Sequence, residues 1–111
     1  MSRINLSRAN LSNADLNHAV LSHAILSEAN LSQVNLRFSD LSSTNLKNAD
    51  LSNAYLIRAV LKNADLENAN LCSADLTRAD LNGANLCRTL YNSQTQFPLH
   101  FCPSFLGAIL S

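Results

Sequence analysis

Cysteine, histidine and serine are the side chains of this chain that could act as nucleophiles, bases or metal ligands. Cys72, Cys87 and Cys102 are an odd number of thiols with no close pairing. A disulfide requires Cα atoms within roughly 7 Å, and these spacings do not indicate one, so we expect free thiols. Serine recurs at regular intervals and is not set against a histidine base. We therefore expect no catalytic residue, no cofactor and no enzyme.

The elements that position these residues follow from a leucine at every fifth position, from Leu6 to Leu86 without a miss. At roughly 100° per residue, a helix would spread such leucines around its whole circumference. In a flat strand, whose side chains alternate, a spacing of five would put successive leucines on opposite faces. The backbone must instead turn by a constant angle every five residues, so that the leucines face a common axis. This repeat predicts an all-β solenoid.

The residues around each leucine are equally regular. A small side chain, mostly alanine, lies two positions before it, and Asn or Asp usually lies between them. The runs at 49–53 and 64–68 both read Ala-Asp-Leu-x-Asn, and they resemble the pentapeptide-repeat family of bacteria. The resemblance covers residues 4 to about 91. It implies a right-handed, four-sided parallel β-helix with four pentapeptides in each coil, in which the leucine and the small residue both face inward.

Several positions depart from this pattern without breaking it. The inward small site is varied by Ile4, Val34, Ser39, Thr44 and Thr89, and the family tolerates such substitutions. The chain has only two glycines and two prolines, so the repeat itself must set its turns. Short polar Ser, Asn and Asp side chains suit those corners.

The two ends of the repeat differ, and we expect one domain with residues 1–91 as the β-helix and 92–111 as its C-terminal cap. Phe97, Phe101 and Phe105 lie in this tail, where they would cover the last coil or, alternatively, dock a partner. Residues 91–98 read Tyr-Asn-x-x-Thr-x-Phe-Pro, which resembles the ending of many bacterial members of the family.

No cap is visible at the other end, where the repeat begins at once with Arg3 and Ile4. An exposed first coil could pair edge to edge with a second copy and form a homodimer. It could equally be blunted by Arg3 and by fraying.

The charge balance limits the partners. Eight Lys and Arg residues offset eight Asp and Glu residues, so we expect no nucleic-acid partner. The resemblance offers an alternative function, because some family members mimic duplex DNA and regulate the type II topoisomerase gyrase. That role depends on a strongly negative surface, and the neutral balance disfavours it. The longest apolar run, residues 105–110, is too short to span a membrane. Without a secretory signal, the expected compartment is the cytoplasm.

One side of the predicted β-helix is unusual. If residues one coil apart stack, Leu16, Leu36, Leu56 and Leu76 share a side whose outward positions combine aromatic and arginine residues. Such residues are enriched in protein interfaces. The candidate partner-binding face comprises His18, Arg37, Phe38, Tyr55, Ile57, Arg58 and Arg78.

This face has two interpretations. It could dock another protein, or His18, Phe38 and Arg58 could simply cover one another in a ladder with the arginine over the ring. His23 would fall on the neighbouring side, so it would not share a metal site with His18. The sequence predicts a non-catalytic structural or protein-interaction module.

Overall fold

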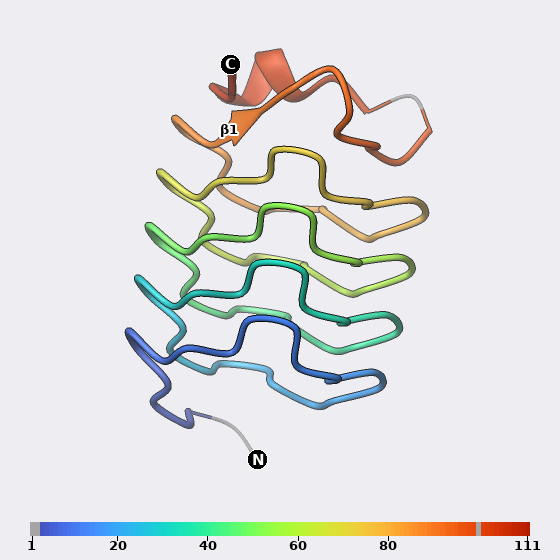
Figure 1. Cartoon of the computed structure of the whole chain (residues 1–111). Helices are drawn as coiled ribbons and strands as arrows, with labels where there is room; N and C mark the ends of the chain where they lie inside the picture. Colours follow the sequence, from blue (N-terminus) through green and yellow to red (C-terminus); the bar gives the residue numbers. More distant parts are fainter. Residues whose placement is uncertain (1–2, 100) are drawn as a thin grey trace.

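The computed structural model describes residues 3–99 and 101–111, without the side chains of residues 104 and 105. The chain winds into coils stacked along one axis, from the N-terminal coil (blue) to the C-terminal end (red) (Figure 1). Parallel bridges join residues twenty apart, from Asn5 and Ile25 to Asn70 and Leu90. Each coil therefore holds four pentapeptides. The right-handed, four-sided parallel β-helix expected from the sequence is confirmed.

Every pentapeptide ends in a tight corner. The N–H of the small residue donates to the C=O of the leucine three positions earlier, as from Ala49 to Leu46 at 3.1 Å. The second residue after each leucine is left-handed, with non-glycine φ values that run from 55° at Ser43 to 65° at His18. A positive φ at this third turn position is the pattern of a type II turn. Asn and Gly83 adopt it easily, whereas a bulky residue such as Phe38 does so at a cost.

The polar residue before each leucine fixes the backbone that leads into the corner. At Asp50, one carboxylate oxygen accepts the Ser52 N–H at 3.0 Å and the Ser52 hydroxyl at 2.7 Å. This Asx turn recurs around the β-helix, because Asn and Asp side chains reach the backbone two residues on. Tyr55 occupies one of these positions and supplies no such acceptor. The corners thus form with few glycines and prolines, as the sequence indicated.

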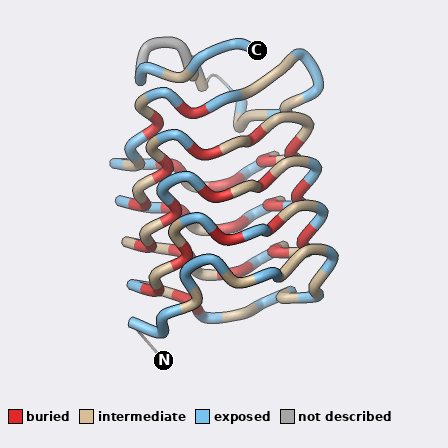
Figure 2. Tube along the Cα trace, turned by 60° about the vertical axis from the view of Figure 1, so that its left-hand side comes forward, coloured by how far each residue is buried: buried red, intermediate tan, exposed pale blue. Residues whose placement is uncertain are grey.

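The core is a leucine stack lined by small residues. The leucines from Leu26 to Leu76 are completely buried, and buried positions recur along the coils above the N-terminal one (Figure 2). Where a polar residue replaces alanine, its hydroxyl donates to a nearby carbonyl: Ser39 to Leu36 O at 2.6 Å and Thr44 to Leu41 O at 2.7 Å. No buried polar side-chain atom lacks a partner in the part of the chain that the structure describes.

The C-terminal segment folds back over the last coil. Strand β1 (Leu90–Tyr91) pairs in parallel with β2 (Ile109–Leu110), and the 3-10 helix η1 (Pro103–Leu106) lies between them. Phe97 and Phe101 pack against the core, and their rings stack at 5.3 Å between centroids. The predicted contribution of Phe105 falls on a side chain outside the described residues.

The coil pattern also continues past residue 91. Asp75 bridges to Gln96, a spacing of 21 residues instead of twenty. The additional residue lies in a turn in which the Thr95 N–H donates to Asn92 O at 3.1 Å. The Thr95 hydroxyl donates to Leu71 O at 2.9 Å, so the longer turn remains tied to the coil beneath it.

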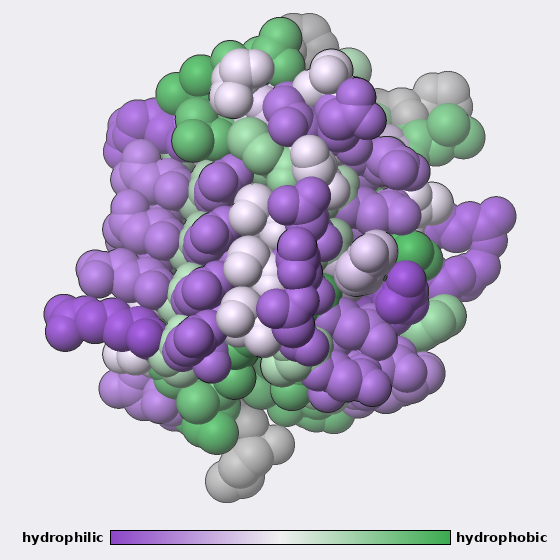
Figure 3. Space-filling model, viewed as in Figure 1, coloured by the Kyte–Doolittle hydropathy of each residue, from purple (hydrophilic) through white to green (hydrophobic). Residues whose placement is uncertain are grey.

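At the first coil the core is less covered. Leu6, Leu11 and Leu16 are only partly buried, and Ile4 is exposed. On the side of the molecule seen in Figure 3, hydrophilic side chains cover the middle coils, and apolar ones gather toward both ends. Among the described residues, no helix is long and apolar enough to cross a membrane.

The cysteines lie near the C-terminal end without pairing. Cys72 and Cys87 are partly buried and Cys102 is exposed, and all three are free. The expected free thiols are therefore confirmed.

Candidate interaction surface

The aromatic–arginine face, as we call His18, Arg37, Phe38, Tyr55, Ile57, Arg58 and Arg78, is positioned by backbone bonds between coils. The His18 N–H donates to Arg37 O at 2.9 Å, and the Phe38 N–H donates to Ile57 O at 3.0 Å. The same bond recurs at Arg58 in the next coil. Because these bonds fix the register, equivalent side chains of successive coils lie one above another, roughly 4.8 Å apart.

The corner column of this face forms a ladder. The His18 and Phe38 rings stack with centroids 5.0 Å apart and an interplanar angle of 6°. The guanidinium carbon of Arg58 lies 6.0 Å from the Phe38 centroid. His18 belongs to the coil before Phe38 and Arg58 to the coil after it, so the ring is covered on both sides. The structure thus contains the ladder that the sequence offered as one interpretation.

A second contact connects two different positions of the repeat. The Arg37 guanidinium carbon lies 4.5 Å from the centroid of the Tyr55 ring, within the usual range of a cation–π interaction. Ile57 is partly buried beside them, and Arg78 extends the corner column as an exposed residue. All seven predicted residues therefore lie on one surface, and five of them make aromatic or cation–π contacts.

These contacts leave much of the aromatic surface open. Phe38 remains 48% exposed and Tyr55 43% exposed, although both are held in place by neighbours. The ladder and an exposed binding surface are therefore compatible descriptions of the same residues.

Three of the eight Lys and Arg residues make ion pairs among the described residues, whereas Arg3, Lys62 and the three arginines of this face do not. The ion pairs within the described residues connect Arg8 to Glu28, Lys47 to Asp65 and Glu67, and Arg88 to Glu67. All of these lie on the side that contains Leu6 and Leu26. Among the described residues, Arg37, Arg58 and Arg78 make no ion pair.

The carboxylates near these arginines bond to their own turns. Asp75 accepts the Thr77 N–H at 3.0 Å and the Thr77 hydroxyl at 2.5 Å. Asp15 accepts the Asn17 N–H at 3.2 Å and the side-chain amide of Asn35 at 3.1 Å. These carboxylates therefore bond to their own turns and to the Asn35 side chain, and not to the arginines.

On the neighbouring side, the pKa of Asp40 lies below its ordinary value. The main cause is the Ser42 hydroxyl, which donates to the carboxylate at 2.7 Å, followed by the Ser42 N–H at 3.0 Å. Partial burial opposes this shift, and the charge of His23 adds a smaller lowering. Hydrogen bonds to the charged form favour that form.

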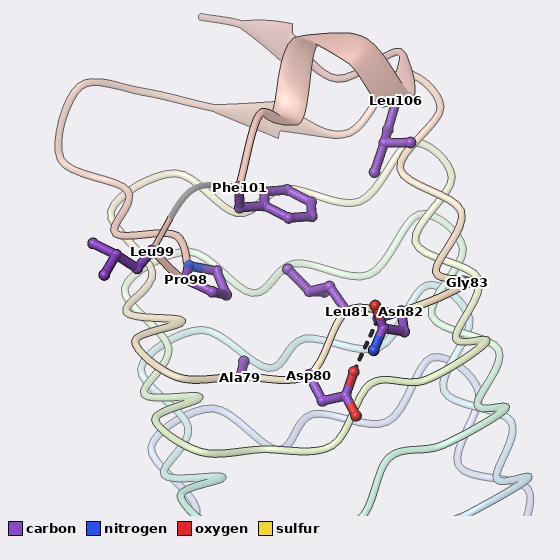
Figure 4. Close-up of a pocket in the computed structure, with 9 residues that line it drawn as sticks. All are labelled: Ala79, Asp80, Leu81, Asn82, Gly83, Pro98, Leu99, Phe101 and Leu106. Atoms are coloured by element: carbon purple, nitrogen blue, oxygen red, sulfur yellow. Dashed lines mark hydrogen bonds between the residues drawn. The ribbon is translucent and has the colours of Figure 1, made fainter.

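A groove that sequence reasoning missed lies between the last coil and the cap (Figure 4). Its volume is about 490 Å³, and it is broadly open. The Asn82 N–H donates to Asp80 at 3.1 Å along one wall. Its lining consists of Ala79, Asp80, Leu81, Asn82, Gly83, Pro98, Leu99, Phe101 and Leu106. No periodic signal marks it, because it arises where the tail leaves the coil pattern.

Within the described residues, no group of three His, Cys, Asp or Glu side chains could hold a metal ion.

Solved structures similar to this one are also built from pentapeptide repeats. A protein from Nostoc Pcc 7120 is 38% identical over 98% of this chain and 86% of its own, with a TM-score of 0.49. One from the cyanobacterium Cyanothece 51142 is 30% identical over 86% of each chain, with a TM-score of 0.51. One from the Arabidopsis thaliana thylakoid lumen is 26% identical over 83% of this chain and 66% of its own, with a TM-score of 0.67.

No curated protein matches the sequence. A comparison with protein families, however, agrees with the solved structures. The family described as pentapeptide repeats matches in eight copies, over residues 4–37, 35–71 and 54–90. Since these matches extend over most of the coils, the chain belongs to the pentapeptide-repeat family.

Proposed function

We propose that this protein is a non-catalytic module that binds another protein through the aromatic–arginine face. The observation that carries the proposal is the combination of exposed Phe38 and Tyr55 rings with arginines that make no ion pair among the described residues. Tyr and Arg are enriched among the residues that dominate interface energies.

The rigidity of the face favours this role. Phe38 is stacked between His18 and Arg58, and Tyr55 lies under Arg37. Side chains held in this way lose less conformational freedom when a partner binds, which removes part of the entropic cost of association. The ladder would then serve binding as well as stability.

Affinity capture from a lysate of the source cell tests the proposal with a Phe38→Asn/Tyr55→Asn variant. Asn fits both positions, because Asn48 is left-handed at φ 61° and Asn45 occupies the position before a leucine. The matched control is Gln33→Asn/Asp50→Asn, which changes the equivalent positions one side earlier. We expect a protein retained by wild type and control and lost from the first variant. Identical capture by all three would reject the face as a binding site.

A homodimer through the first coil is a second candidate. Ile4 is 42% exposed, and Leu6 and Leu11 are only partly buried, so a second copy could cover this apolar surface and its strand edge. Sedimentation equilibrium over a wide concentration range tests it. An Ile4→Asn variant that dissociates a wild-type dimer would support pairing at this coil, whereas a wild-type monomer at every concentration would exclude it.

Regulation of gyrase by DNA mimicry has no comparable support. The eight acidic residues are balanced by eight basic ones, and three of the basic residues lie on the aromatic–arginine face. We expect no effect of the protein in a supercoiling assay at micromolar concentration.

A further inference from the structure

We infer that the segment recognised by the aromatic–arginine face is an acidic peptide of a partner protein, with clustered carboxylates beside an apolar side chain. This inference rests on the proposed function and adds the chemistry of the partner. It depends on the distribution of charge around the β-helix, which the net charge of zero conceals.

Among the described residues, three of the eight Lys and Arg side chains make ion pairs and five do not. On the side containing Leu46 and Leu66, Lys47 and Arg88 are neutralised by Asp65 and Glu67. On the aromatic–arginine face, Arg37, Arg58 and Arg78 make no ion pair among the described residues. Arg3 and Lys62 also make no ion pair among the described residues, but they lie outside this face. A partner that supplies carboxylates would therefore find three of the five unpaired cations together on this face, where planar guanidinium groups can bind them in bidentate fashion.

The order of residues along the face suggests how such a segment lies. Arg58 and Arg78 occupy the same corner on adjacent coils, while Phe38 and His18 occupy it on the two preceding coils. The corner column thus has a cationic half and an aromatic half. An extended segment along the axis would place its carboxylates at Arg58 and Arg78 and its apolar side chain on Phe38, Tyr55 and Ile57.

A nucleic acid fits this surface less well. Its phosphates form a continuous line of negative charge, and Asp15 and Asp75 lie on the same side as the arginines. Asp40 and Asp80 follow on the neighbouring side. A short acidic peptide can match three arginines between these carboxylates, whereas a long polyanion would have to pass over them.

An NMR titration tests the inference on the complete chain, with amide shifts followed as a peptide is added. The probe is acetylated and amidated Glu-Glu-Leu-Glu-Glu, and the comparison peptide has Gln at each Glu. An oligothymidylate of similar length serves as the nucleic-acid probe. We expect the acidic peptide to shift amides near residues 37, 55–58 and 78, and we expect added salt to weaken its binding.

Two variants with the same change in net charge locate the site. Arg58→Gln/Arg78→Gln removes free cations, and Gln fits the corner because Gln33 is left-handed at φ 59°. Lys47→Gln/Arg88→Gln removes ion-paired cations instead. Exposed ion pairs are individually weak, so we expect the loss of two arginines in the first variant to weaken binding of the acidic peptide only about tenfold. We expect the second variant to bind this peptide as wild type does.

The possible failures can be separated. Equal shifts with the Gln peptide, equal losses in both variants, or tighter binding of the oligothymidylate at these residues would each overturn the acidic-peptide inference. If Phe38→Asn/Tyr55→Asn abolishes capture of a cellular protein and Arg58→Gln/Arg78→Gln leaves it unchanged, the proposed function holds and this inference fails. Loss of capture in both variants, with carboxylate-dependent peptide binding, supports both proposals.

Discussion

The imidazole of His18 lies flat on the ring of Phe38, with centroids 5.0 Å apart and planes at 6°, although the two residues are twenty positions apart in the chain. Both residues are left-handed, at φ 65° and 59°. The backbone bonds between coils, and not local sequence, bring the rings together. Contacts between coils therefore help to offset the cost of placing bulky side chains in a conformation that they otherwise avoid.

This stacking predicts a measurable coupling between the two residues. In a double-mutant cycle of His18→Asn and Phe38→Asn, we expect the free energies of unfolding to reveal an interaction of about 0.5–1.5 kcal/mol. Urea unfolding of the four proteins, followed by circular dichroism, provides the measurement. Additive effects of the two substitutions would show that the rings are only neighbours.

Leucine truncation should cost different amounts at the middle and at the first coil. Leu56 is completely buried, so Leu56→Ala should lower the free energy of unfolding by about 2–5 kcal/mol. Leu6 is only partly buried, and Leu6→Ala should cost clearly less. Thermal and urea unfolding of both variants test this order, and equal losses would contradict the burial pattern.

The left-handed corners predict an unusual response to alanine. Asn53 has φ 59°, and a Cβ-bearing residue without a suitable polar side chain pays about 1–2 kcal/mol in this conformation. Asn53→Ala should therefore be destabilising by about 1 kcal/mol. Asn53→Gly is the control, because glycine adopts positive φ freely, and its unfolding midpoint should stay near that of wild type. The opposite order would argue against a strained corner.

Asp40 predicts a specific dependence of stability on pH. Its pKa is lower in the folded protein because Ser42 donates two hydrogen bonds to the carboxylate. A lowered folded-state pKa adds stability above the unfolded pKa of about 3.9, and this contribution disappears as pH falls through the folded value. The stability difference between wild type and Asp40→Asn should therefore shrink from pH 7 to pH 3.

A second variant identifies the cause of the shift at Asp40. Ser42→Ala removes the hydroxyl donor, and the carboxyl resonance should then titrate at higher pH than in wild type. An unchanged titration curve would assign the lowered pKa to a different group.

The sequence predicted the coil architecture well because a single requirement, an inward leucine every five residues, is repeated from Leu6 to Leu86. It did not reveal the left-handed corners, since Arg, His, Phe, Ser and Asn all occupy that position. There the hydrogen bonds of the turn and the next coil determine φ, and the side chain changes only the energetic cost of that conformation.

The same distinction applies to the candidate surface. The contact of Phe38 with Arg58 follows from stacking of equivalent positions, whereas Arg37 reaches Tyr55 from a different position of the repeat. That contact depends on the length of the arginine side chain. The pairing of β1 with β2 and the groove beside Pro98 lie where the period has ended, so no pattern could indicate them.

The spacing of twenty residues between stacked positions also determines which insertions and deletions the protein can tolerate. Gain or loss of one complete coil returns every later residue to the same side of the square. Gain of one pentapeptide between Phe38 and Arg58 would preserve the leucine core but rotate all later residues by a quarter turn, moving Arg58 and Arg78 away from Phe38. Natural length variation in this protein should therefore occur in whole coils wherever this surface is retained, even though the fold itself would accept single pentapeptides.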